Sequence, residues 1–339
     1  MRAFKTNVYR IVILGLILTT QWTTLSWSQV TPKEKGFTRI DMLYEGLPVT
    51  VYKKSKAGEE ELEKPVFVFV QGSLPVPVFF NDKSGNLFFG AVPFSITNEL
   101  LEDYHFLIIS KPGVPGVLSK DSLNSNYMYM KDEYHAPDDF TQNDHLEFYV
   151  DRNVFLMSEL QDKEWFGDTL VVAGHSQGSH IAAMWASHDE RVKSLIFLSG
   201  SPLGRMGSML TERRDKGSNT NSLFTYWEGV VENKDDFTAP KGGDSPASEW
   251  SFNKPIIDDI LSLKIPALIV YGTEDYGIFA NDYLRLQAIS AGNETITFKE
   301  YPGLEHNFFP KDSTNNIDYS KPHWNEVISD ALDWLDTIE

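Results

Sequence analysis

The chain has 339 residues, of which 41% are hydrophobic and 23% are charged, and it contains no cysteine. This composition is typical of a globular protein with a core large enough to need no disulfides, and the lack of thiols excludes a cysteine nucleophile and cysteine-based metal sites. The formal net charge of −18 at pH 7 argues against nucleic acids and anionic membranes as partners.

Residues 1–28 predict a secretory signal peptide, with cleavage before Gln29. It starts with the basic residues Arg2, Lys5 and Arg10 and continues with an apolar run over residues 11–18. Ser26 and Ser28 are the small residues before the cleavage site. The apolar run is too short to span a bilayer, and an uncleaved membrane anchor is the alternative. Removal of three basic residues and no acidic residue would take the net charge from −18 to −21. We therefore expect a secreted or periplasmic protein.

Short apolar runs predict the first strands. Segments 38–43 and 48–53 are expected to form an antiparallel hairpin. The fully apolar run 65–70 is typical of a central strand covered on both faces, and 104–110 predicts the next buried strand. Because ligands of a doubly wound sheet bind beyond the carboxyl ends of its strands, the N–H of Ser73, just after the central strand, is a candidate donor to an oxyanion. A plain turn is the alternative.

The connections between these strands differ in length and character. Residues 74–93 predict a long loop rich in proline, phenylalanine and glycine, which either lines a pocket or forms a surface cluster of its own. Residues 94–101 are expected to form the crossover helix. The irregular segment 117–141 is long for a loop, which suggests a functional role, and residues 142–163 show helical periodicity.

Residues 170–186 predict a strand, a tight turn and a helix, with Ser176 at the apex of the turn. The turn reads Gly174-His-Ser-Gln-Gly178, and this G-x-S-x-G pattern is typical of a nucleophile elbow. The two glycines have no Cβ to clash where the backbone turns sharply, and the N–H of Gln177 at the start of the helix could stabilise an oxyanion. A strand-to-helix turn with a capping serine is the alternative.

The remainder of the chain alternates strands and helices, interrupted by one long insertion. The predicted strands are 192–199, 265–271 and 295–301, and the predicted helices are 281–291 and 324–338. The insertion, about 201–264, is too long for a single crossover, and we expect it to form a helical cap over the strand ends.

Three side chains follow predicted strands in the order Ser176, Asp275 and His306. A serine needs a base to remove its proton, a histidine titrates near neutrality, and a carboxylate can orient the histidine and stabilise the imidazolium. Because the strands end on one edge of the sheet, we predict that the three form a catalytic triad. Glu274 is the alternative acid.

Other titratable residues receive a structural interpretation. Alternation along the strand points His175 away from the nucleophile, and His180 and His188 are expected to be packing or surface residues. The remaining histidines have no metal-ligand spacing. We therefore predict no metal site and no cofactor, and we interpret the pairs Asp138-Asp139 and Asp235-Asp236 as solvated loop charges.

The triad order, together with Gly174-His-Ser-Gln-Gly178, Tyr271-Gly-Thr-Glu-Asp275 and Tyr301-Pro-Gly-Leu-Glu-His306, resembles the α/β-hydrolase family over nearly the whole chain after residue 36. The histidine segment is similar to those of dienelactone-hydrolase-like and prolyl-peptidase-like branches. Gln71-Gly72 replaces the usual His-Gly, and Lys111-Pro-Gly-Val-Pro-Gly116 replaces the usual Asp-x-Arg-Gly.

This resemblance implies an α/β fold, namely a doubly wound, mostly parallel eight-stranded sheet with a helical cap inserted after the sixth strand. It implies that Ser176, Asp275 and His306 form the triad, and that Ser73 and Gln177 supply the oxyanion hole. We expect one hydrolase domain over 29–339, with the cap at about 201–264.

The expected function is that of an exported serine hydrolase acting on a carboxylic ester through an acyl-enzyme. A small-molecule ester or a short peptide is the expected substrate. The alternatives are a peptidase or amidase of the same fold, an acyl transferase to an alcohol, and a non-catalytic binding protein. Aromatic residues in the insertion and phenylalanines at 79–89 favour a partly apolar substrate group.

Overall fold

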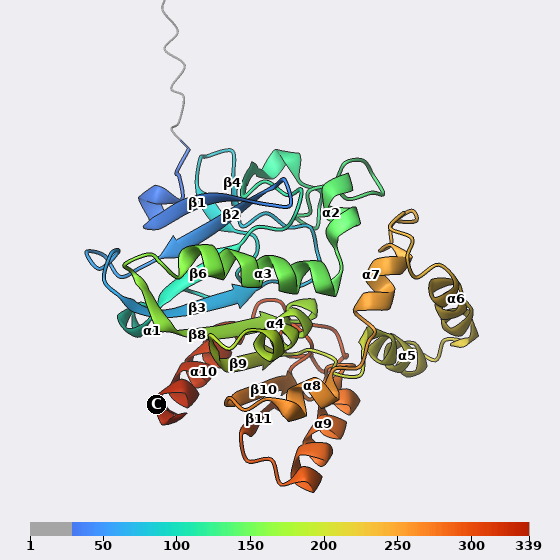
Figure 1. The fold of residues 1–339 in the computed structure, drawn as a ribbon. Helices are drawn as coiled ribbons and strands as arrows, with labels where there is room; N and C mark the ends of the chain where they lie inside the picture. The colour runs from blue at the N-terminus through green and yellow to red at the C-terminus, as the bar shows by residue number, and fades with distance from the viewer. Residues whose placement is uncertain (1–28, 339) are drawn as a thin grey trace, which may run out of the picture.

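The computed structural model describes residues 29–338, so the predicted signal peptide lies outside the described residues. The fold is built on an eight-stranded sheet with the order β1-β2-β6-β3-β8-β9-β10-β11 (Figure 1). Its strands are β1 (Phe37–Tyr44), β2 (Leu47–Lys54), β3 (Lys64–Val70), β6 (His105–Ile109), β8 (Phe166–His175), β9 (Val192–Leu198), β10 (Ala267–Gly272) and β11 (Ile296–Tyr301). Strand β2 pairs antiparallel with β1 and β6, and all other neighbours are parallel. The predicted mostly parallel eight-stranded sheet is confirmed.

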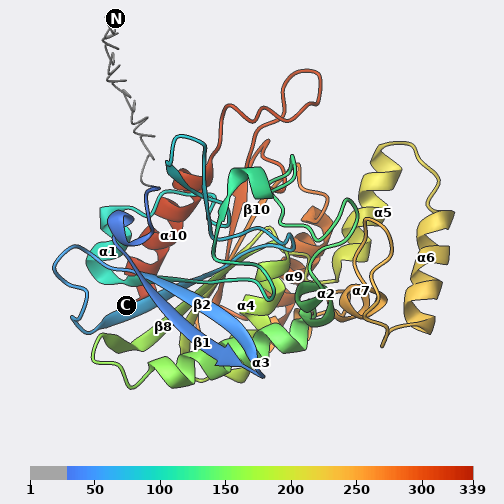
Figure 2. The ribbon, with the colours of Figure 1, turned by 90° about the horizontal axis from the view of Figure 1, so that it is seen from above.

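Helices cover both faces of the sheet, and each face has its own apolar core. The helices of one face are α3 (Leu146–Leu160), α4 (Gln177–His188), α8 (Ile257–Ser262) and α9 (Ile278–Ala291), and those of the other are α1 (Asn98–Asp103) and α10 (Trp324–Ile338). In β3, Val66 and Val68 point to the first core, and Phe67 and Phe69 point to the second. This alternation explains why the whole run is apolar. In Figure 2 the strands lie between α3 and α10.

Four helices lie between β9 and β10, where the sequence predicts a cap. Helices α5 (Arg205–Asp215), α6 (Asn221–Glu232) and α7 (Pro246–Ser251) stand to one side of the sheet, and we call them the insertion (Figures 1 and 2). Helix α8 instead packs against α4 and α9. The helical segment follows the sixth strand of the sheet, as expected, but its last helix belongs to the layer that covers the sheet.

The segment 74–93, predicted as a long loop, lines a cavity beside Ser176 at both of its ends but is not irregular throughout. This segment contains β4 (Phe79–Asn81) and β5 (Leu87–Phe89), which join β7 (Val117–Ser119) in a three-stranded sheet. Each strand has only three residues, so none gives a periodic signal. The predicted helix 94–101 begins later, at Asn98, because the hydroxyl of Thr97 caps it by accepting from Leu100 N–H at 3.3 Å. The remaining elements are η1 (Lys33–Lys35), η2 (Lys120–Ser122) and α2 (Asp138–Asn143).

Candidate active site

Ser176 lies at the apex of the turn between β8 and α4, in an unusual backbone conformation. Its φ of 58° and ψ of −122° lie outside the regions that side-chain-bearing residues normally adopt. The N–H of Ser176 donates to the carbonyl of Leu198 in β9 at 3.0 Å, which ties the turn to the neighbouring strand. The surrounding sheet therefore holds a strained serine at the carboxyl end of a central strand, as expected for a nucleophile elbow.

The two glycines of the turn are required by close backbone contacts. A Cβ on Gly174 would lie 2.1 Å from the carbonyl oxygen of Gly178, and a Cβ on Gly178 would lie 2.1 Å from the carbonyl oxygen of Val70 in β3. Both distances are far below van der Waals contact, and both involve backbone atoms that cannot rotate away. Glycine is therefore needed at both positions because α4 packs tightly against the ends of β3 and β8.

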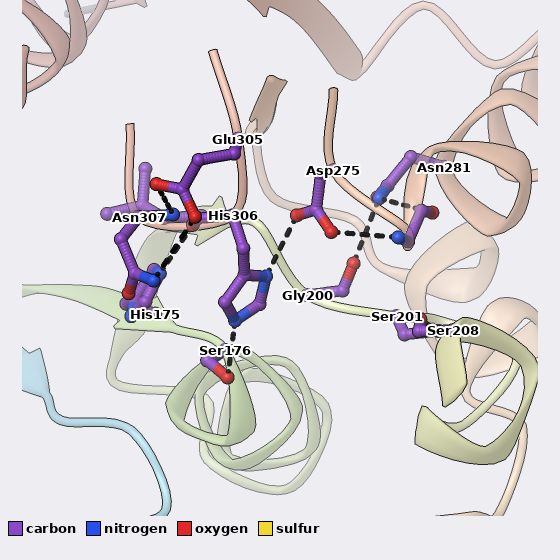
Figure 3. Close-up of polar contacts among 12 residues, drawn as sticks. His175, Ser176, Gly200, Ser201, Ser208, Asp275, Asn281, Glu305, His306 and Asn307 are labelled. Carbon is purple, nitrogen blue, oxygen red and sulfur yellow. Dashed lines mark hydrogen bonds and ion pairs between the residues drawn. The ribbon is translucent and has the colours of Figure 1, made fainter. Parts of the chain in front are cut away.

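The structure brings Ser176, His306 and Asp275 together in one chain of hydrogen bonds (Figure 3). The Ser176 Oγ lies 2.9 Å from His306 Nε2, and His306 Nδ1 lies 2.9 Å from Asp275 Oδ2. An imidazole that donates from Nδ1 to the carboxylate presents Nε2 as the acceptor for the serine proton. The geometry therefore suits proton transfer from the hydroxyl to the imidazole.

Electrostatics favour an ionised Asp275 and a basic His306. Asp275 is 4% exposed, and the N–H of Gly277 donates to its Oδ1 at 2.8 Å. Burial raises the pKa of Asp275, but the charge and hydrogen bond of His306 outweigh this effect, so the net pKa is lowered. Burial likewise lowers the pKa of His306, and Asp275 more than compensates, so its net pKa is raised. The carboxylate can thus stabilise an imidazolium.

Two backbone amides are available beside the serine. Gln177 begins α4, and the loop that contains Ser73 passes close to the nucleophile, because a Cβ on Gly72 would lie 3.6 Å from Ser176 Cβ. Within residues 29–338, neither the amide of Ser73 nor that of Gln177 donates to another residue. Both residues line the same cavity as Ser176 and His306. The two amides, which the sequence predicts as oxyanion donors, thus remain unpaired within the described residues, beside this cavity.

His175 supports the loop that carries His306. Its Nε2 lies 3.0 Å from the carbonyl oxygen of His306, and its ring packs edge-to-face on Trp324 at 4.8 Å. Burial, and then the charge of His306, lowers the pKa of His175 to about 3. A neutral His175 that donates to this carbonyl fits the predicted structural role.

Within the described residues, none of the other predicted candidates hydrogen-bonds to Ser176 or His306. Glu274 forms an ion pair with Lys311 at 3.2 Å rather than contacting His306. His188 is exposed at the end of α4, whereas His180 is buried and lines the cavity beside Ser176. Among residues 29–338, no three histidine or acidic side chains are grouped to hold a metal ion, and no helix has the length and apolar character needed to cross a bilayer.

Sequence reasoning missed Asp144, which ends α2 and contacts the residue after the nucleophile. Asp144 is 3% exposed and accepts hydrogen bonds from Gln177 Nε2 at 3.0 Å, Tyr149 Oη at 2.9 Å and Ser248 Oγ at 3.0 Å. These partners come from the elbow, from α3 and from α7 of the insertion. Asp144 therefore joins the residue after the nucleophile to the insertion. An aspartate in a polar loop gives no signal of this role in the sequence.

The comparisons with known proteins agree with this architecture. The family model described as "Dienelactone hydrolase family" matches residues 242–339, which include Asp275 and His306 but not Ser176. None of the curated proteins compared with the chain matches it in sequence.

Several solved structures share the fold at low sequence identity. Est1E from Butyrivibrio proteoclasticus, with ferulic acid bound, superposes with a TM-score of 0.52 at 16% identity, over 88% of this chain and 98% of that chain. Porphyromonas gingivalis dipeptidyl peptidase 4 superposes with a TM-score of 0.53 at 10% identity, over 89% of this chain and 35% of that chain. For Pyrococcus horikoshii acylaminoacyl peptidase the TM-score is 0.50 at 14% identity, over 81% of this chain and 38% of that chain.

These likenesses establish the fold. The chain covers less than half of the length of each of the two peptidases. The eight-stranded sheet, the elbow between β8 and α4 and the structural neighbours together identify the α/β-hydrolase fold. The resemblance to α/β-hydrolases noted in the sequence is thereby confirmed.

Proposed function

From the α/β-hydrolase fold and its site, we propose that the chain is an exported serine hydrolase that cleaves a carboxylic ester through an acyl-enzyme on Ser176. The observation that carries this proposal is the pair of 2.9 Å hydrogen-bonding distances that link Ser176, His306 and Asp275. A serine–histidine–carboxylate chain of this geometry activates the hydroxyl for attack on a carbonyl carbon. The strained turn at the end of β8 supports the same role.

The proposed reaction has two halves that use the same groups. Ser176 Oγ attacks the ester carbonyl while His306 Nε2 takes its proton, and the amides of Ser73 and Gln177 donate to the oxyanion of the tetrahedral intermediate. His306 then returns the proton to the leaving alcohol, which leaves an acyl-enzyme. A water molecule, deprotonated by His306, attacks this ester, and His306 returns the proton to Ser176 Oγ as the acid is released. Asp275 stabilises the imidazolium in both halves.

We prefer an ester to an amide as the substrate because the chain covers nearly the whole length of an esterase but only part of each peptidase. It covers 98% of the esterase Est1E but only 35% and 38% of the two peptidases. Amides remain the second candidate, since the two peptidases share the fold with TM-scores of 0.53 and 0.50. A panel of esters and aminoacyl amides separates the two, and added alcohol acceptors detect acyl transfer.

Covalent labelling tests the nucleophile directly. The protein beginning at Gln29 would be incubated with a fluorophosphonate probe, and its intact mass would be measured. We expect a single adduct that Ser176→Ala abolishes and that Ser187→Ala, an exposed serine on the same helix, retains. A folded wild-type protein that forms no adduct would contradict the proposal and favour a non-catalytic binding protein.

Export is a separate part of the proposal and has its own measurement. Expression of the full chain in a bacterial host with a Sec pathway should yield a processed protein outside the cytoplasm. Its intact mass should correspond to a chain that begins at Gln29. An unprocessed chain that stays with the membrane would instead support the anchor alternative.

A further inference from the structure

Ser176 and His306 lie between two cavities of different character. One cavity, of about 310 Å³, lies beneath the insertion and reaches Arg205 and Ser208 of α5. The other, of about 620 Å³, lies on the far side of the serine, towards Trp324 of α10. Figure 3 shows Ser208 on one side of the serine–histidine pair and His175 and Asn307 on the other. Both volumes suit part of a small-molecule substrate.

The cavity beneath the insertion offers hydrogen-bond donors with little net positive charge. Arg205 donates through Nη2 to Asp244 at 2.6 Å and to Glu249 at 2.8 Å, and the two carboxylates offset its charge. Within residues 29–338, no residue accepts from its Nε or Nη1. In the same part of the chain, the buried His180 Nε2 and Ser199 Oγ have no partner. Unpaired buried polar groups are costly. An uncharged group rich in oxygen acceptors can accept from the unpaired N–H groups of Arg205, whereas an anion would be repelled by Asp244 and Glu249 behind it.

The cavity on the far side has apolar and aromatic walls. Phe69 and Trp324 are buried residues in its lining, and Phe309 packs edge-to-face on Tyr319 at 5.3 Å. Tyr319 and Leu74 also line the cavity, although 70% and 51% of their surfaces are exposed. A planar apolar group bound here would cover both side chains and would stack against aromatic rings. The cavity therefore suits an aryl group.

We propose that the substrate is an amphipathic ester, with an aryl group in the cavity beside Tyr319 and a small, uncharged, oxygen-rich group in the cavity beside Arg205. The scissile carbonyl lies between them, at Ser176. This inference rests on the proposed hydrolase function and specifies the two groups that the ester bond joins. Either group can be the acyl part, because His306 lines both cavities.

The test uses two esters that carry both groups and two esters that each lack one of them. Glyceryl phenylacetate and benzyl methoxyacetate each join an aryl group to an oxygen-rich group, in the two possible orientations. Glyceryl butyrate lacks the aryl group, and benzyl butyrate lacks the oxygen-rich group. We expect one of the first two esters to exceed both others in kcat/KM by at least about 10-fold, and the better orientation identifies the acyl cavity.

Two variants assign the preference to the two cavities. Tyr319→Ala should lower kcat/KM by about 3- to 10-fold for esters with an aryl group and much less for glyceryl butyrate. Ser208→Ala should lower it by about 3- to 10-fold for esters with an oxygen-rich group and much less for benzyl butyrate. Leu43→Ala, which removes an exposed apolar side chain on β1, is the matched control and should change no ratio.

The failure of this inference can be distinguished from that of the proposed function. If wild-type protein forms the fluorophosphonate adduct but hydrolyses all four esters with similar kcat/KM, the two-cavity assignment is wrong and the hydrolase function stands. Variants that lower the rates for all esters equally would also overturn the assignment. If no adduct forms, the proposed hydrolase function itself fails, and the assignment fails with it.

Discussion

Replacing Asp144 with alanine removes the acceptor shared by Gln177, Tyr149 and Ser248. Lys111 Nζ donates to Tyr149 Oη at 3.3 Å and cannot accept its proton, so Gln177, Tyr149 and Ser248 each lose an acceptor. A buried donor without an acceptor costs about 1–3 kcal/mol, which gives about 3–9 kcal/mol for the three. A Gln177 side chain released from Asp144 also loosens the residue whose amide we propose as an oxyanion donor.

The rate of fluorophosphonate labelling measures the second effect. Complete loss of one oxyanion donor costs about 10²–10³ in rate. Because the Gln177 amide is displaced rather than deleted, we expect Asp144→Ala to slow labelling by about 10- to 100-fold at equal folded fraction.

Two matched variants isolate the cause. Asp144→Asn keeps an oxygen that accepts from Gln177 and an amide that can donate to Ser248. Burial lowers the pKa of Lys111 to about 8, so Lys111 can lose its proton when the carboxylate charge is removed. The labelling rate of Asp144→Asn should fall by less than about 10-fold. Ser248→Ala cuts only the link to α7 and should label at nearly the wild-type rate. Folded Asp144→Ala that labels as fast as wild type would refute the reasoning.

Two further predictions concern the histidine and the glycine turn. Protonated His306 cannot accept the serine proton, and its net pKa is raised above its ordinary value of 6.5, so the labelling rate should fall as the pH drops through a midpoint above 6.5. A midpoint below 6.5 would mean that burial lowers the pKa of His306 by more than Asp275 raises it. Gly178→Ala places a Cβ 2.1 Å from a β3 carbonyl and should destabilise the protein by on the order of 3 kcal/mol or more in denaturant unfolding. Gly229→Ala, in α6 with no atom within 4 Å, should be neutral or stabilising, and equal effects of the two changes would contradict the packing argument.

The sequence predicted the parts of the fold that depend on local pattern. The apolar run of β3 and the strand–turn–helix around Ser176 are recognisable because burial on both faces and a sharp turn each restrict residue type over several neighbouring positions. The order of the triad residues then placed Asp275 and His306 at one sheet edge. Their meeting at 2.9 Å distances depends on strand order, which no local pattern contains.

The features that sequence reasoning missed depend on contacts between distant segments. Strands β4, β5 and β7 have three residues each, so their pairing adds no periodicity that a window could detect. Asp144 resembles any loop aspartate until α3, the elbow and the insertion pack around it. The limits of the insertion were also hard to predict, because α8 is short and packs against α4 rather than with α5–α7.

The order of strands in the sheet has a consequence for folding. Ser176 follows β8 near the middle of the sheet, whereas Asp275 and His306 follow β10 and β11 at its far edge. Nucleophile and base are 130 residues apart in the chain, so a chain whose last strands have not yet joined the sheet holds the serine without its base. Under the proposed function, reactivity at Ser176 therefore requires that β10 and β11 have joined the sheet, and covalent capture at this residue counts only the molecules in which both strands are in place.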